Sequence, residues 1–146
     1  YPINGKYSER QRQVYDIVLR ANREVAKAAK PGMTTVELND ICKKVLAEGC
    51  IALGLIKEES ELSKYYMHGV SHHLGIDVHD VTVASNAALR PGAVITDEPG
   101  LYIDEWEIGI RIEDDLLITE DGCEVLSEGI MRDPDEIERY MAACRA

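Results

Sequence analysis

The sequence has 146 residues, of which 45% are hydrophobic and 29% charged, and its net charge is −11. This composition is typical of one soluble globular domain, and the negative charge with scattered lysines and arginines argues against nucleic-acid or membrane-surface binding. No apolar run approaches the roughly 18 residues that cross a membrane. The four cysteines, Cys42, Cys50, Cys123 and Cys144, form no CxxC motif, so we expect reduced thiols and a cytoplasmic protein.

The first part of the chain predicts two amphipathic helices. Residues 8–30 start with a Ser-x-x-Gln capping box, carry apolar side chains on one face, and end before a Pro-Gly pair. A second helix is expected from Thr34, which opens a Thr-x-x-Glu capping box, and Gly49 is its predicted end. The stretch 51–64 is apolar and then charged, and its structure is ambiguous.

From Tyr65 onward the pattern changes to short β-like runs that contain glycines. These runs are YYMHG, the segment around GIDVHD, AVITDEPGLYI, GIRIEDDLLIT and CEVLSE, and a short acidic helix begins near Pro134. Two helices, a mostly antiparallel sheet and a short C-terminal helix predict an α+β fold in a single domain over residues 1–146, rather than a βαβ alternation.

All four histidines of the protein lie within twelve residues: His68, His72, His73 and His79. This crowding favours a functional site, although a polar loop whose imidazoles bond backbone groups is the alternative. His68 and His72 have the spacing of a helical zinc pair, but HGVSH contains a glycine and lacks the glutamate of H-E-x-x-H. We therefore expect the histidines to act from a strand or a turn.

The run GIRIEDDLLIT combines charges with β-branched residues. As a strand it would alternate between two faces, one with Gly109, Arg111 and Glu113 and the other with Ile110, Ile112 and Asp114. Charges on one face and isoleucines on the other suit a buried functional site. A solvated ion pair on an edge strand is the alternative.

The run TDEPGLY places Glu98 directly before Pro-Gly, where proline holds the preceding residue in an extended conformation. By itself this motif is an ordinary turn. Together with the histidines and Glu113, however, it supplies an imidazole and two carboxylates. Such a ligand set suits Mn, Co, Fe or Zn in hydrolytic chemistry, in which paired metals activate a shared water.

Three motifs in this order, HGVSHHLGIDVHD, ITDEPGLYI and GIRIEDDLLIT, resemble the C-terminal half of the catalytic domain of aminopeptidase P and prolidase. These are Xaa-Pro metallopeptidases of the pita-bread fold, and the resemblance covers nearly all of the chain. It implies a hydrolase that releases the N-terminal residue from peptides with proline in the second position.

The resemblance also implies roles for individual residues. His72 would be the imidazole ligand of the first metal, Glu98 a carboxylate ligand and the candidate general base, and Glu113 the bridge between two metals. His79 would contact the substrate and steady the tetrahedral intermediate, and Arg111 would orient the bridging carboxylate as part of the catalytic group.

His68 matches a family histidine that lines the substrate pocket, whereas His73 stands where the family usually has a bulky aromatic residue and is expected to pack. Asp97 is a departure, because an apolar residue usually precedes the glutamate. The family's two metal-binding aspartates, a further histidine and the N-terminal domain lie upstream of the position that matches Tyr1. The chain is thus expected to be a partial catalytic domain.

Family members hold two divalent metals per site, and manganese is favoured over cobalt or zinc. Because three ligands of the first metal and one of the second are present, we expect this chain alone to bind at most one ion, weakly, and to be inactive. An uncovered apolar sheet face and a free strand edge would favour self-association, for example as a homodimer.

Three alternatives to the aminopeptidase remain. A prolidase, which cleaves dipeptides, shares the same site residues. A metal-free pita-bread module for binding peptide or protein is disfavoured because all three ligands are retained, and creatinase-like hydrolysis without a metal is disfavoured for the same reason.

Overall fold

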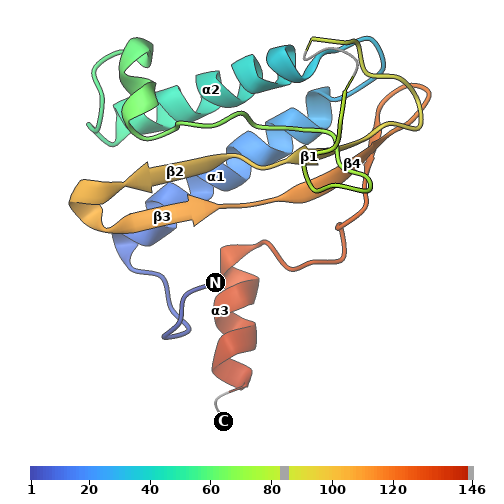
Figure 1. The fold of residues 1–146 in the computed structure, drawn as a ribbon. Coiled ribbons are helices and arrows are strands. Elements are labelled where there is room, and N and C mark those ends of the chain that lie inside the picture. Colours follow the sequence, from blue (N-terminus) through green and yellow to red (C-terminus); the bar gives the residue numbers. More distant parts are fainter. Residues whose placement is uncertain (83–85, 145–146) are drawn as a thin grey trace.

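The computed structural model describes residues 1–82 and 86–144 and has the predicted α+β architecture (Figure 1). In chain order the elements are α1 (Glu9–Ala28), α2 (Thr35–Ala52), the 3-10 helix η1 (Glu59–Lys64), β1 (Val94–Asp97), β2 (Gly100–Ile103), the 3-10 helix η2 (Asp104–Trp106), β3 (Ile108–Arg111), β4 (Asp114–Ile118), β5 (Cys123–Val125) and α3 (Pro134–Ala143). Within the described ranges, none of the helices has the length and apolar character that a membrane span needs.

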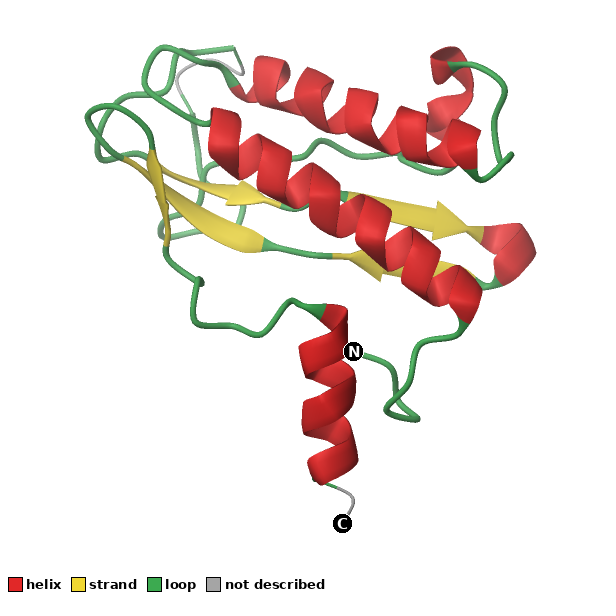
Figure 2. Ribbon diagram, turned by 180° about the vertical axis from the view of Figure 1, so that it is seen from behind, coloured by secondary structure: helices red, strands yellow, loops and turns green. Residues whose placement is uncertain are grey.

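Helices α1 and α2 form one layer, and α1 lies across the strands (Figure 2). Both predicted capping boxes are present, with Ser8 bonded to Gln11 and Thr34 bonded to Glu37. The caps satisfy backbone N–H groups that the first turn of a helix leaves without partners, which is why both helices begin where the sequence predicts.

The prediction that Gly49 ends the second helix is wrong, because α2 continues to Ala52. A Cβ atom at position 49 would lie 2.5 Å from Cγ2 of Ile17, so this glycine serves the close approach of α2 to α1. The chain leaves the helix at Gly54 instead, where φ is +72°, a left-handed conformation that glycine adopts without steric cost.

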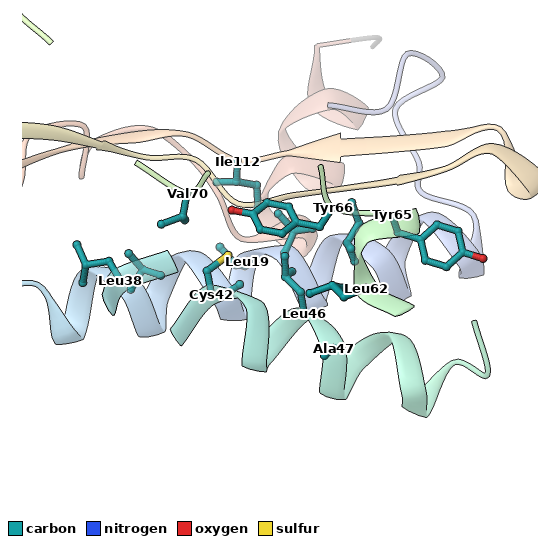
Figure 3. Packing of buried hydrophobic residues seen from close by; sticks show 14 of the residues in the cluster. Leu19, Leu38, Cys42, Leu46, Ala47, Leu62, Tyr65, Tyr66, Val70 and Ile112 are labelled. Carbon is teal, nitrogen blue, oxygen red and sulfur yellow. The ribbon is translucent and has the colours of Figure 1, made fainter. Parts of the chain in front are cut away.

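The hydrophobic core lies between the helix layer and the strands (Figure 3). Leu38, Cys42 and Leu46 of α2 are fully buried and face Tyr66 and Val70 of the segment that precedes the strands. The four cysteines are free, and burial raises the pKa of the Cys42 thiol to about 12.

A side-chain amide of α2 fixes the segment that carries the histidines. The Asn39 Oδ1 atom accepts hydrogen bonds from the Tyr66 hydroxyl at 2.9 Å and from the Val70 backbone N–H at 3.1 Å. Residues 66–70 are therefore attached to the helix layer, although they have no regular secondary structure.

Strands β1 to β4 form two antiparallel ladders in one continuous register, and β5 pairs antiparallel with the other edge of β4. Ladder β1–β4 ends with Asp97 opposite Asp114, and ladder β2–β3 begins with Gly100 opposite Arg111. We call β1 with β2 one arm of the sheet and β3 with β4 the other. The break between the ladders falls at Glu98–Pro99 on the first arm, where Pro99 has no N–H to donate, and at residues 112–113 on the second. The predicted runs AVITDEPGLYI and GIRIEDDLLIT are thus each split into two strands.

Two predicted strands are absent from the described residues. The segment YYMHG bonds the neighbouring arm only at separated points, such as the Tyr102 N–H to the Tyr65 carbonyl at 2.9 Å, so no ladder forms. The segment around GIDVHD folds back on itself, because the Asp80 carboxylate accepts the Ile76 N–H at 3.1 Å and the Asp80 N–H bonds the His73 carbonyl at 3.0 Å.

Helix α3 begins at Pro134, as predicted, and Asp133 caps it. It extends away from the strands, and the N-terminus of the chain lies beside its first turn (Figure 1). The Tyr1 hydroxyl donates to the Met131 carbonyl at 2.9 Å, and Arg12 of α1 pairs with Asp135 at 2.6 Å.

Candidate metal centre

The break between the two ladders is where the candidate ligands meet. Carrying the register through the break places Glu98 directly opposite Glu113. Because side chains alternate between the two faces of a strand, both glutamates point to the face opposite to that of the neighbouring Asp97 and Asp114. Two carboxylates from separate arms are thereby brought together by backbone pairing alone.

His72 reaches the same place from the segment before the strands. Its backbone is tied to Thr96 of β1 by two hydrogen bonds of 3.0 Å, one to the Thr96 hydroxyl and one from the Thr96 N–H. Its Nδ1 atom lies 2.9 Å from the His73 carbonyl, so Nδ1 carries the proton, and Nε2 lies 3.2 Å from Glu98 Oε1. Metal-binding histidines characteristically donate their second ring N–H to a carbonyl in this way.

The three side chains present a compact ligand set. One ligand atom from each of His72, Glu98 and Glu113 lies within 4.8 Å of the other two. An imidazole nitrogen with carboxylate oxygens fits a divalent cation such as manganese, cobalt or zinc. The side chains of Glu98 and His72 are 12% and 22% exposed, whereas that of Glu113 is 43% exposed, so the set opens toward solvent on the Glu113 side.

Arg111 lies beside both carboxylates, with its guanidinium 3.9 Å from Glu98 Oε2 and 3.6 Å from Glu113 Oε2. The predicted alternation of faces is correct, since Ile112 and Asp114 are buried while Arg111 and Glu113 point outward. Of the two alternatives that the sequence left open, a solvated ion pair describes Arg111 and Glu113 better, because their side chains are 51% and 43% exposed.

The other histidines surround the ligand set at different distances. The ring of His79 stands edge-on to that of His72, with 4.3 Å between their centroids, and is exposed. His68 is farther along the segment, where its Nε2 lies 3.0 Å from the Tyr102 hydroxyl. His73 is half-buried, and its backbone forms an isolated bridge with Ile95.

A buried polar cluster lies behind the ligands, on the opposite face of the strands. The amide of Asn22 on α1 donates to Asp97 Oδ2 at 3.2 Å and to Asp114 Oδ2 at 3.1 Å. Arg132 forms an ion pair with Asp114, and the Ser127 hydroxyl also donates to that carboxylate. We call these five residues the Asn22 cluster.

Sequence reasoning missed Asn22, Ser127 and Arg132. A signal for Asn22 existed, because a polar residue stands between Ala21 and Val25 on the otherwise apolar face of α1, and it is only 3% exposed. Buried amides of this kind are expected to have specific partners. The partners themselves come from strands far away in the sequence.

The two aspartates of the Asn22 cluster differ in their affinity for protons. Burial, reinforced by the neighbouring Asp114 carboxylate, raises the pKa of Asp97 to about 9. Burial also opposes ionisation of Asp114, but hydrogen bonds from Arg132, Ser127 and Asn22 outweigh it and lower the pKa of that carboxyl. The pair therefore carries one negative charge at neutral pH, located on Asp114.

The raised pKa of Asp97 predicts how the stability of the metal-free chain depends on pH. Between the ordinary aspartate pKa of about 3.9 and the folded value of about 9, the folded state holds a proton that the unfolded state has lost. The free energy of unfolding should therefore fall as pH rises through this window, and Asp97→Asn should flatten the profile. Urea unfolding between pH 5 and 9 measures this, and parallel profiles for the two proteins would contradict it.

Comparison with known proteins identifies the family of this chain. The model of metallopeptidase family M24 matches residues 1–120. The Xaa-Pro aminopeptidase of Escherichia coli (strain K12) is 40% identical over 163 residues, which cover 99% of this chain and 37% of that protein. The mitochondrial intermediate cleaving peptidase 55 of Arabidopsis thaliana is 40% identical, over 97% of this chain and 30% of that protein.

Solved structures share the fold. A Bacillus anthracis protein assigned as an aminopeptidase P superposes with a TM-score of 0.95 at 57% identity, over 98% of this chain and 34% of that one. Escherichia coli aminopeptidase P with the inhibitor Pro-Leu gives 0.93 at 40% identity, over 99% and 37%, and its zinc-substituted form in complex with product gives 0.93 at 40%, over 100% and 37%. This chain therefore spans about a third of the length of the relatives that it matches, and it belongs to metallopeptidase family M24.

Proposed function

We propose that this chain supplies part of the active site of a metal-dependent Xaa-Pro aminopeptidase, which releases the N-terminal residue from peptides with proline in the second position. The observation that carries the proposal is the convergence of His72, Glu98 and Glu113 to within 4.8 Å. The likeness to Escherichia coli Xaa-Pro aminopeptidase and to the structure of that enzyme with Pro-Leu supports the substrate class.

The three ligands would hold a divalent cation, with manganese favoured because two of the three donors are carboxylates. A zinc-substituted Escherichia coli aminopeptidase P supports a site that accepts zinc as well. A bound cation of this kind polarises a carbonyl and makes a water acidic enough to attack at neutral pH.

Each side chain around the cation would then have its own task. Glu98 is enclosed by His72 and the Thr96 hydroxyl, so its carboxylate is positioned to accept the proton of the attacking water. Arg111 would balance the charge of Glu98 and Glu113, since its guanidinium lies near both carboxylates. His79 would donate a hydrogen bond to the oxyanion that develops on the scissile carbonyl, a stabilisation that acts in the transition state.

His68 would line the pocket for the peptide. Its Nδ1–H is directed to the Gly69 carbonyl at 2.9 Å, so its Nε2 accepts from the Tyr102 hydroxyl. This pairing holds the imidazole and the phenol ring together at the edge of the β2–β3 ladder. The pair would present a partly apolar wall to the substrate.

Metal binding by this chain alone tests the ligand assignment. We expect at most one Mn²⁺ per chain, bound weakly, because three ligands surround one position and Glu113 alone serves a second. Titration calorimetry should show this, and Glu98→Gln or Glu113→Gln should remove the heat, whereas Glu124→Gln on β5 should not. Two tight equivalents of Mn²⁺ or Co²⁺ would refute the ligand count.

A chimaera tests the catalytic function, in which this chain replaces the matching 37% of the Escherichia coli enzyme. We expect the chimaera to cleave an Xaa-Pro tripeptide in the presence of Mn²⁺, and Glu98→Gln to lower kcat about 100-fold or more, as loss of a general base does. The isolated chain should show no useful rate. Cleavage of Xaa-Pro dipeptides alone would indicate a prolidase, and robust tripeptide cleavage by the isolated chain would contradict the incomplete site.

Self-association is proposed from the exposed apolar side chains near the site. Ile76, Val78 and Val81 are almost fully exposed on the loop that carries His79. Light scattering at high concentration should give a mass above the 16.3 kDa of one chain, and serine at these three positions should shift it toward the monomer. A strictly monomeric mass for the unsubstituted chain would count against this proposal.

A further inference from the structure

The carboxylate of Glu113 has little to hold it in place. Among the described residues its ion pair is with Arg111, at 3.6 Å, and both side chains are about half exposed. Glu98, by contrast, is enclosed by His72 and Thr96. The position of the Glu113 oxygens relative to those of Glu98 is therefore set chiefly by the backbone on which Glu113 stands.

That backbone is anchored from behind, by the residue next to each ligand. Asp97 precedes Glu98 and Asp114 follows Glu113, and these two aspartates form the last pair of the β1–β4 ladder. Their exposures are 0% and 5%, and Asn22, which bonds both carboxylates, is 3% exposed. One amide group thus joins the two arms at the edge of the break.

Asp114 is also held from a third direction. Arg132 and Ser127, in the connection between β5 and α3, both bond its carboxylate, and the Arg132 guanidinium bonds the Ser127 carbonyl at 2.7 Å as well. The arm that carries Glu113 is therefore tied both to α1 and to the C-terminal connection. Because these contacts lie on the face away from the candidate ligands, they touch neither the metal position nor a substrate.

We propose that Asn22 is a positioning residue that sets the separation of Glu98 and Glu113 by joining Asp97 to Asp114 across the two arms. The inference rests on the proposed metal site. Removing a group that hydrogen-bonds a metal ligand typically lowers metal affinity by about 10–100-fold. Asn22 acts instead through the residues next to the ligands, and we expect its removal to cause a loss in the same range.

A purely structural role for Asn22 would lower stability without changing the break itself, so the test compares Asn22→Ala with Val25→Ala. Val25 is fully buried on the same face of α1, and its aliphatic side chain can hydrogen-bond neither aspartate, which makes it a matched control for lost packing. Unfolding in urea measures the stability of both variants, and all readouts are taken where each is fully folded.

The first readout needs no metal. The Glu98 N–H bonds the Val70 carbonyl at 2.8 Å, and the Ile112 N–H bonds the Pro99 carbonyl at 3.2 Å, so these amides report on the two sides of the break. Loss of stability alone should speed hydrogen exchange at these two amides in Val25→Ala. In Asn22→Ala, exchange at both amides should be about tenfold faster than in Val25→Ala. Equal acceleration in the two variants would overturn the positioning role.

The second readout is the Kd for Mn²⁺, from the paramagnetic broadening of amide resonances near His72. It should rise about 10–100-fold in Asn22→Ala and stay within about twofold in Val25→Ala. Absence of broadening in the unsubstituted chain would overturn the proposed metal site, while the amide exchange would still decide the role of Asn22. Unchanged affinity in Asn22→Ala would overturn the inference.

Two further variants cover the case in which Asn22→Ala does not fold. Ser127→Ala removes one bond from Asp114 and leaves Asn22 in place, so the same readouts should move in the same direction by a smaller factor. Asp97→Asn keeps an oxygen that accepts from the Asn22 amide, and it should preserve both readouts. A loss of affinity in Asp97→Asn equal to that expected for Asn22→Ala would contradict the proposal.

Discussion

The two long arms of the sheet pair in a single antiparallel register that is interrupted for two residues and then resumes, and the rest of the site depends on this constraint. Pairing on both sides of the interruption forces Glu98 to face Glu113, although fourteen residues separate them in sequence. Pro99 contributes to the interruption because it has no N–H to continue the ladder. Two like charges are thus held close by hydrogen bonds elsewhere in the sheet.

The repulsion between these carboxylates is offset on both faces of the sheet. On the open face, the Arg111 guanidinium lies near both glutamates. On the buried face, Arg132 pairs with Asp114, while Asp97 stays protonated at neutral pH because burial raises its pKa. Four carboxylates within a few residues of the break are therefore compatible with a folded chain, because each has a cation, a proton or an amide beside it.

Much of this could be predicted from the sequence, because the decisive signals are local. The capping boxes at Ser8 and Thr34 specify where the helices begin, and the alternation around Glu113 specifies which side chains share a face. The errors arose where tertiary contacts override a local rule. Glycine is typical of a helix end, but Gly49 lies within α2 and allows its close approach to Ile17. The segment around GIDVHD alternates like a strand, but its backbone bonds the Asp80 side chain instead of a neighbouring strand. The partners of Asn22 could not be predicted, since they lie more than seventy residues away.

The single amide oxygen of Asn39 has a mechanical consequence. By accepting from both the Tyr66 hydroxyl and the Val70 N–H, it joins the stretch before His72 to α2, the helix that closely approaches Ile17 of α1 at Gly49. The backbone of His72 is itself bonded to Thr96 of β1, so the imidazole is held between helix and sheet and is not the tip of a loose loop. The position of His72 relative to the glutamates therefore depends on α2 and β1 together.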